Sequence, residues 1–157
     1  MKILTRSQSG FTVIELVVVV IILCILGTLV ALTYSGIQAS NRDKERQADI
    51  ETMQSQLETH HATFDKYPSL AEINNPTWRA EKMKNLSDDI MRDPQWSAEG
   101  VCALEGKPIL GPGKDCYVYE VTAADGAACD NVTVSCTHYT LTATLEGNQA
   151  FVKASLK

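Results

Sequence analysis

The chain has 157 residues and a formal net charge of −5, with 45% hydrophobic and 21% charged residues. This length indicates one domain with at most an appendage, and the composition excludes a disordered polyelectrolyte and a coiled-coil rod. The acidic balance provides no general basic surface for nucleic acid, so no specific nucleic-acid partner is expected. Only one apolar run is long enough to span a bilayer, which excludes a multipass membrane protein.

A short basic leader and a long apolar run open the chain. Residues 1–10 carry Lys2 and Arg6 and no acid, and the run from Leu16 to Leu32 carries no charge. A secretory signal has a shorter apolar stretch followed by an Ala-x-Ala cut site, and this segment does not fit that pattern. We therefore expect a single membrane-spanning helix.

Glu15 is the unusual residue of this segment, because it places a carboxylate at one end of the apolar run. An acid at the centre of a membrane helix costs roughly 2.5–3.5 kcal/mol. The 13 Leu, Ile and Val residues of the run together contribute about −4 to −8 kcal/mol, so insertion is still favoured. An acid in a membrane segment often marks a functional site. The alternative is that the carboxylate of Glu15 only reaches to the membrane–water interface.

The segment Gly10-Phe11-Thr12-Val13-Ile14-Glu15-Leu16 resembles the class III signal of type IV prepilins and type II secretion pseudopilins. The resemblance implies that a membrane prepilin peptidase cuts between Gly10 and Phe11 and methylates the new amine of Phe11. It also implies that Glu15 acts in assembly by pairing with the Phe11 amine of a neighbouring subunit. Such pairing is physically reasonable, because an amine and a carboxylate stabilise each other in an apolar setting.

Beyond the run, the pattern remains helical as far as Phe64. Apolar residues recur at spacings of three, four and seven, which predicts a stripe that packs against a head. The members of the stripe are Ile50, Met53, Leu57 and Phe64. Arg42 with Glu45, and Asp43 with Arg46, are expected to pair on a mixed-charge face. The expected organisation is a leader (1–10), a spine helix (11–66, with 11–34 as the transmembrane and polymerisation segment) and a head (67–157).

The head is expected to end in an antiparallel sheet, which gives an α+β pilin fold. A short helix is predicted over Trp78–Met91 with Thr77 as its N-cap, and Trp78 and Trp96 are expected to anchor the core. Strands are predicted for four segments that are rich in β-branched and aromatic residues: Cys116–Val121, Val132–Ser135, Tyr139–Leu145 and Ala150–Ser155. Glu146-Gly147-Asn148 is predicted as a hairpin turn.

Four cysteines near the C-terminus favour two disulfides in an oxidising compartment, which places the head outside the cytoplasm. They are Cys102, Cys116, Cys129 and Cys136, and Cys24 lies apart in the apolar run. Four cysteines allow three pairings, and we favour nearest neighbours, Cys102–Cys116 and Cys129–Cys136. Their spacing lacks the close pairs typical of a zinc site.

No catalytic or cofactor motif is present, so the chain is not expected to be an enzyme. His60, His61 and His138 are expected to be solvated or interfacial. No cofactor is expected. Calcium held by oxygen ligands near Asp125-Gly126 and Asp130-Asn131 is the weaker hypothesis.

The function predicted from the sequence is that of a type IV pilin-like subunit of a filament used in adhesion, motility or DNA uptake. Its expected partners are identical subunits in a helical filament, the prepilin peptidase, an inner-membrane platform and an assembly ATPase. The precursor would cross the cytoplasmic membrane once, with the N-terminus inside, and the assembled filament would lie at the cell surface. The alternatives are a type II secretion pseudopilin or minor pilin, and a membrane-anchored binding module that does not polymerise.

Overall fold

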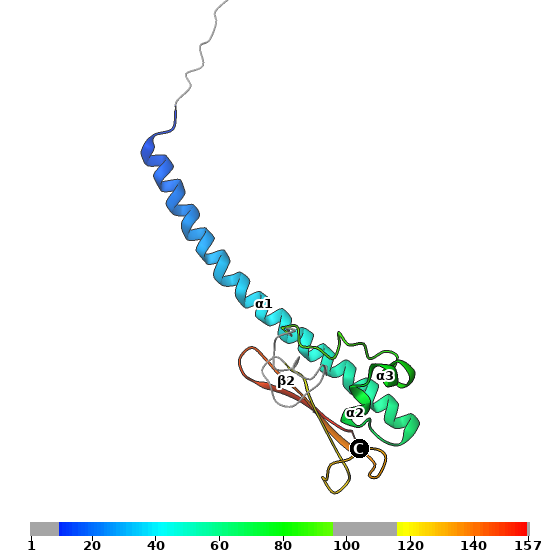
Figure 1. Cartoon of the computed structure of the whole chain (residues 1–157). Helices are drawn as coiled ribbons and strands as arrows, with labels where there is room; N and C mark the ends of the chain where they lie inside the picture. Colours follow the sequence, from blue (N-terminus) through cyan, green and yellow to red (C-terminus); the bar gives the residue numbers. More distant parts are fainter. Residues whose placement is uncertain (1–9, 96–115, 157) are drawn as a thin grey trace, which may run out of the picture. The chain divides into compact units, whose positions relative to one another are not determined.

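The computed structural model of the chain describes residues 10–95 and 116–156. The chain divides into two compact units, Met1–Ala39 and Ser40–Lys157. Helices come first and strands last (Figure 1), in the order α1, α2, α3, β1, β2, β3. The predicted α+β fold, a long N-terminal helix followed by an antiparallel sheet, is confirmed.

Helix α1 runs over Val13–Phe64, 52 residues in all. It begins two residues after the predicted start of the spine helix at residue 11 and ends two residues before its predicted end at residue 66. At its end Asp65 adopts a left-handed conformation (φ 56°) and donates its N–H to the carbonyl of His61 at 2.7 Å. A left-handed residue after the last turn is a common helix stop, and aspartate tolerates it better than most side chains.

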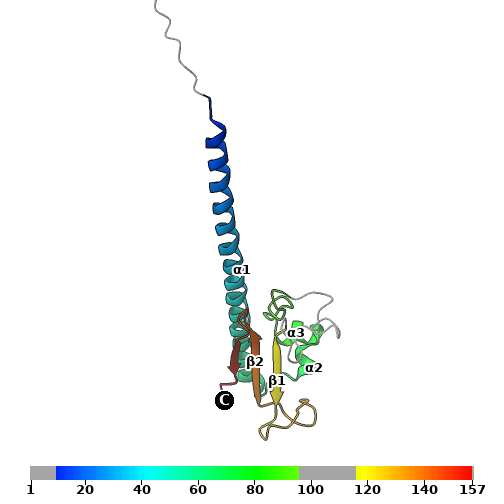
Figure 2. The ribbon, with the colours of Figure 1, turned by 90° about the vertical axis from the view of Figure 1, so that its left-hand side faces the viewer.

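Three strands form one antiparallel sheet in the order β1-β2-β3 (Figure 2): Val118–Thr122, His138–Thr144 and Ala150–Ala154. Tyr119 lies opposite Leu141, and Leu141 lies opposite Lys153. Successive side chains of a strand point to opposite faces of the sheet. Tyr119, Leu141 and Lys153 therefore lie on one face, and the residues before and after each of them lie on the other.

The predicted hairpin turn between β2 and β3 is confirmed. Leu145 donates its N–H to the carbonyl of Gln149 at 2.8 Å, and Asn148 has φ 58°. The predicted strand at Val132–Ser135 is wrong, because this segment is a bend with no ladder partner. The carboxylate of Asp130 accepts the backbone N–H groups that a strand would have used.

The core lies between the second half of α1 and one face of the sheet. Ile50, Met53 and Leu57 are fully buried, as the stripe predicted, but Phe64 is 43% exposed. The core also contains residues of the connecting segments and of the strands: Tyr67, Ile73, Met83, Leu86, Met91, Tyr117, Tyr119, Cys136, Tyr139, Leu141 and Ala143. The second half of α1 is therefore part of the head unit.

Two short helices follow α1, beside strand β1 (Figure 2). Helix α2, Leu70–Ile73, was not predicted, although its capping box was present in the sequence. Ser69 and Glu72 exchange the two hydrogen bonds of that box.

Helix α3 is Pro76–Lys82, so the predicted helix Trp78–Met91 was placed too late and made too long. The N-cap is Asn75, not Thr77, because the Asn75 side chain accepts the N–H groups of Thr77 and Trp78. Pro76 takes the first helical position, where its missing N–H has no cost. Trp78 is partly buried against the core, and Trp96 lies outside the described residues.

Candidate functional site

Thr12 and Glu15 form a capping box at the start of α1. Oε2 of Glu15 accepts the backbone N–H and the hydroxyl of Thr12, both at 2.8 Å, and the N–H of Glu15 lies 3.4 Å from Oγ1 of Thr12. A threonine and a glutamate three residues apart satisfy two N–H groups that the helix leaves free. With the leader attached, the Glu15 carboxylate therefore caps the N-terminus of its own helix.

The bond between Gly10 and Phe11 lies just outside this capped end. Gly10, Phe11 and Thr12 are not helical, and Phe11 is 86% exposed. A shallow groove of about 290 Å³ runs along the first turns, lined by Phe11, Ile14, Glu15, Val18 and Val19. The predicted cleavage position and the predicted assembly residue thus share one short, accessible stretch of chain.

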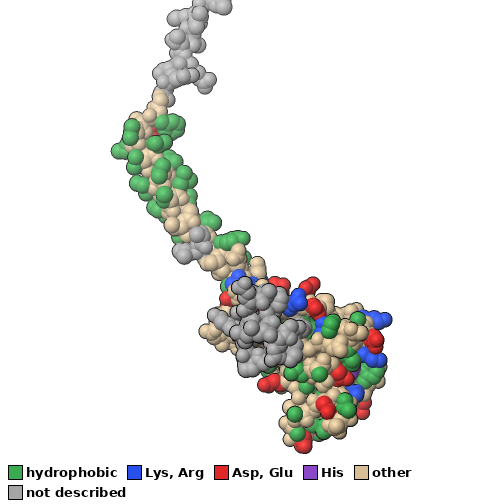
Figure 3. Space-filling view, in the orientation of Figure 1, with side chains coloured by type: hydrophobic (Ala, Val, Ile, Leu, Met, Phe, Trp, Pro, Cys, Tyr) green, Lys and Arg blue, Asp and Glu red, His purple; other side chains and the backbone are tan. Residues whose placement is uncertain are grey.

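The part of α1 in the first unit has an apolar surface (Figure 3). Its described Leu, Ile and Val side chains are all about half exposed or more. Among the described residues, α1 is the one helix long and apolar enough to cross a membrane. Cys24 is exposed on it with a free thiol. A helix that buries none of this surface in its own chain requires lipid or other helices around it.

In the head, the guanidinium of Arg46 is buried, with only 2% of its side chain exposed. It forms a two-point ion pair with Asp93, with Nε–Oδ2 at 2.7 Å and Nη2–Oδ1 at 3.0 Å. It also donates to Asp43 at 3.0 Å, to Glu146 at 3.2 Å and to Gln95 at 2.7 Å. The expected Asp43–Arg46 pair is confirmed, but it is one contact of a larger cluster.

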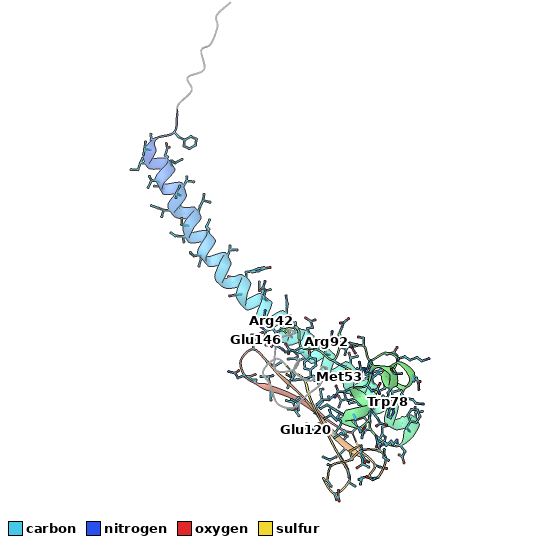
Figure 4. All side chains as sticks on the ribbon, in the orientation of Figure 1. Arg42, Met53, Trp78, Arg92, Glu120 and Glu146 are labelled. Atoms are coloured by element: carbon cyan, nitrogen blue, oxygen red, sulfur yellow. A yellow bond between two sulfur atoms is a disulfide. The ribbon has the colours of Figure 1, made fainter. Side chains whose placement is uncertain are left out.

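Arg42 pairs with Glu146 at 2.6 Å, where the expected partner was Glu45 (Figure 4). The hydrogen bond from Arg42 holds the pKa of Glu146 below its usual value. Glu146 also donates its backbone N–H to Asp43 at 2.9 Å. These contacts fasten the β2–β3 turn to α1.

Glu58 is a second polar centre of the head. It accepts hydrogen bonds from Tyr139 at 2.8 Å, from Tyr67 at 3.0 Å and from the backbone N–H of Leu156 at 3.2 Å. Burial and the contact with Glu58 raise the pKa of Tyr67 to about 12. The hydroxyl therefore stays protonated and keeps donating.

The connection between β1 and β2 is held by a disulfide and by two polar side chains. Cys129 and Cys136 are bonded, which confirms that predicted pair. Backbone N–H groups donate to the carboxylate of Asp130 and hold its pKa well below its usual range, and the N–H of Val134 has the largest effect. Asn131 (φ 60°) donates to the carbonyl of Tyr67 at 2.8 Å. The other predicted pair stays a prediction, because Cys102 lies outside the described residues.

The histidines do not form a site. His138 is exposed and His61 is half-buried, as expected, but His60 is buried and was predicted wrongly. Its ring stacks against Phe64 and Trp78, and burial lowers its pKa. In the described ranges, no three His, Cys, Asp or Glu side chains are grouped so as to hold a metal ion.

Comparison with known proteins places the capped helix and the head in a family. Residues 5–31 match the family described as prokaryotic N-terminal methylation motif. The chain is 30% identical over 103 residues to type II secretion system core protein G of Dickeya chrysanthemi, covering 60% of this chain and 67% of that protein. It is 31% identical over 77 residues to type II secretion system core protein G of Aeromonas hydrophila, covering 46% of this chain and 54% of that protein. No solved structure matches it.

This chain belongs to the type IV pilin and pseudopilin family. The family consists of structural subunits. The apolar N-terminal helix fits a membrane-anchored precursor of this family. The Thr12–Glu15 box of this chain lies inside the matched residues 5–31, just after the predicted cleavage position.

Sequence reasoning missed the polar centres of this pilin-family head. Arg46 and Asp93 are 47 positions apart and Glu58 and Tyr139 are 81 apart, so no local pattern connects them. A local signal was available only for helix α2, whose capping box is Ser69-x-x-Glu72.

Proposed function

We propose that this chain is the polymerising subunit of a pseudopilus of the type II secretion kind. Both relatives reported above are core proteins of that secretion system. The sequence alone favoured a surface pilus for adhesion, motility or DNA uptake, and the relatives favour the pseudopilin alternative. The proposed precursor crosses the cytoplasmic membrane once, with the leader inside and the head outside.

The observation that carries this proposal is the position of Glu15. It is the one acid among residues 11–42, and it lies four residues beyond Phe11 within the matched motif. Cleavage between Gly10 and Phe11 creates an α-amine at the apolar end of the helix. Pairing of that amine with Glu15 of a neighbour neutralises two charges that are each costly in lipid.

Assembly in this proposal requires Glu15 to exchange partners. Before cleavage its carboxylate accepts two hydrogen bonds from Thr12. After cleavage the methylated amine of an adjacent subunit competes for the same oxygen atoms, and a charged partner binds more strongly than a neutral one. The proposed partners are identical subunits, the prepilin peptidase, the membrane platform and the assembly ATPase. No cofactor is needed.

Two substitutions at Glu15 test the proposal. Glu15→Leu removes both the charge and the capping box, whereas Glu15→Gln keeps an N3 side chain able to cap and removes only the charge. We expect both variants to insert in the membrane and both to lose filaments, scored as subunit released in sheared fibres. Filament yield equal to the wild type in Glu15→Gln would exclude the charge pairing. A binding module that does not polymerise would form no fibres with any residue at this position.

A further inference from the structure

The connection between strands β1 and β2 (Figure 2) contains a segment whose two ends, Cys129 and Cys136, are bonded to each other. We call residues 129–136 the clasp. It carries Asp130 and Asn131, two of the residues for which calcium was the weaker hypothesis from the sequence. Calcium takes about six to eight oxygen ligands from carboxylates, amides, carbonyls and water. Whether the clasp can supply them depends on what its oxygen atoms already bind.

The carboxylate of Asp130 is occupied by donors of its own loop. Oδ1 accepts the backbone N–H groups of Val132, Thr133 and Val134 at 2.8, 2.7 and 3.1 Å, and Oδ2 accepts the hydroxyl of Thr133 at 2.9 Å. Each of these hydrogens points its positive end at the oxygen atoms that a cation would have to approach. A calcium ion at Asp130 would displace these donors and leave them without an acceptor.

Asn131 is committed in the same way. Its Oδ1 accepts the backbone N–H of Cys136 at 2.9 Å, and its Nδ2 donates to the carbonyl of Tyr67 at 2.8 Å and to Oε2 of Glu72 at 2.6 Å. The carbonyl of Cys136 in turn accepts the N–H of Tyr67 at 2.9 Å. Two residues of the clasp therefore bind both backbone polar groups of Tyr67, just beyond the end of α1.

Asp125 is the other acid of the β1–β2 connection, and it lies outside the clasp. Its Oδ1 accepts the backbone N–H of Ala127 at 3.0 Å, and its side chain is exposed. In the part of the chain that the structure describes, no three His, Cys, Asp or Glu side chains are placed to hold a metal ion together. The donor set of this connection therefore does not fit calcium, which needs several oxygen ligands at once.

The clasp satisfies the hydrogen bonds of its own backbone. The N–H groups of residues 130–134 and of Cys136 find acceptors inside it, on the carbonyl of Val134 and on the side chains of Asp130 and Asn131. Asn131 takes the left-handed conformation (φ 60°) that asparagine tolerates better than most residues. Cys136 is fully buried, so the disulfide anchors this stretch in the core. The covalent bond and these hydrogen bonds together supply the order of the clasp.

We propose that the clasp is closed by thiol oxidation alone, fastens the β1–β2 connection to Tyr67 and requires no calcium. In the closing step the thiols of Cys129 and Cys136 lose two protons and two electrons, and a disulfide of a thiol oxidant is reduced to two thiols. The head would thus depend on a thiol oxidant in its compartment and not on the supply of a divalent cation. The inference concerns the folded head and does not require that the chain polymerises.

Urea unfolding of the full-length chain in detergent tests the proposal with and without calcium. We expect the wild type to have the same midpoint in millimolar calcium and in excess EGTA. Cys129→Ser/Cys136→Ser should have a lower midpoint in both media, and calcium should not restore it. A wild-type midpoint that rises with calcium would overturn the proposal. A variant without the disulfide that is as stable as the wild type would overturn it as well.

Hydrogen exchange separates a hydrogen-bond acceptor from a metal ligand. Asp130→Ala should speed the exchange of the N–H groups of Val132, Thr133 and Val134 at least tenfold, whereas the matched variant Asp125→Ala should leave them unchanged. Calcium added to the wild type should not alter these rates. Rates that respond to calcium, or an equal effect of the two substitutions, would overturn the proposal. A chain that forms no filaments would overturn the proposed function alone, because both measurements report on the folded head.

Discussion

Arg46 and Asp93 form a buried two-point ion pair, although they are 47 residues apart. The two distances are 2.7 Å and 3.0 Å, and the side chains are 2% and 1% exposed. The pair joins α1 to the segment after α3, and Glu146 extends it to the β2–β3 turn. The head is therefore held together by a charged centre as well as by its apolar core.

Replacing Arg46 should destabilise the head strongly. Arg46→Met leaves Asp93 buried without its countercharge, and such a loss costs roughly 3–5 kcal/mol. Arg42→Met removes an ion pair that is 27% exposed on both sides, and solvent screening makes such a pair contribute far less. Urea unfolding of the detergent-solubilised chain, followed by tryptophan fluorescence, measures both. Equal midpoints for the two variants would contradict the assigned role of Arg46.

Glu58 should contribute more to the stability of the head than any one of the groups that donate to it. Glu58→Ala leaves two tyrosine hydroxyls and a backbone N–H without an acceptor, at about 1–3 kcal/mol in total after water compensates part of the loss. Tyr139→Phe removes one donor only and should cost about 0.5–1.5 kcal/mol. The same urea unfolding measurement compares the two variants. A larger loss of stability in Tyr139→Phe than in Glu58→Ala would show that Glu58 is not the centre of this hydrogen-bonded group.

The stability of the head should depend on the protonation of Asp49. Burial raises the pKa of Asp49 to about 6, although it accepts a hydrogen bond from Tyr117 at 2.7 Å. In the unfolded chain the pKa is about 3.9, so folding favours the protonated form. This contribution to the free energy of unfolding is complete below about pH 4 and is lost as the pH rises through about 6.

The Asp49→Asn variant separates the pH dependence caused by Asp49 from that of all other titrating groups. The amide oxygen still accepts the Tyr117 hydroxyl, and the cost of a buried charge disappears. We expect the variant to gain about 1–2 kcal/mol over the wild type at pH 7, since the site is only partly shielded from water. The gain should vanish at pH 4. A constant difference between the two proteins from pH 4 to pH 8 would contradict the raised pKa.

The Cys129–Cys136 disulfide should stabilise the β1–β2 connection. The chain-entropy estimate for a loop of this length is about 2–3 kcal/mol. Cys129→Ser/Cys136→Ser should lower the urea midpoint accordingly and loosen Asn131, whose side chain bonds to Tyr67. Hydrogen exchange of the N–H groups of Val132, Thr133 and Val134 reports the loosening. Protection unchanged from the wild type would show that Asp130 alone holds the loop.

The long helix and the sheet could be predicted because their signals are local and repeated. The stripe of Ile50, Met53 and Leu57 recurs at helical spacing, and Tyr139–Leu145 alternates with period two. Val132–Ser135 has the composition of a strand, yet Asp130 takes its N–H groups. A single side chain that competes for the backbone is not visible in a pattern of hydrophobicity.

The polar centres could not be predicted, because they depend on the tertiary fold. Arg46 lies on a helix face that looks solvated in sequence, and it is buried only because the segment around Asp93 covers it. At the N-terminus the opposite holds. The apolar run is contiguous in the chain and was predicted, whereas the Thr12–Glu15 box was not predicted, although a threonine three residues before a glutamate is a local signal for it.

Mass spectrometry of the N-terminus of the subunit recovered from filaments tests the central claim most directly. The account predicts a chain that begins at a methylated Phe11 and lacks residues 1–10. Filaments built from subunits that retain Met1 and the leader would contradict it, because an intact Gly10–Phe11 bond leaves no amine at Phe11 for Glu15 to bind.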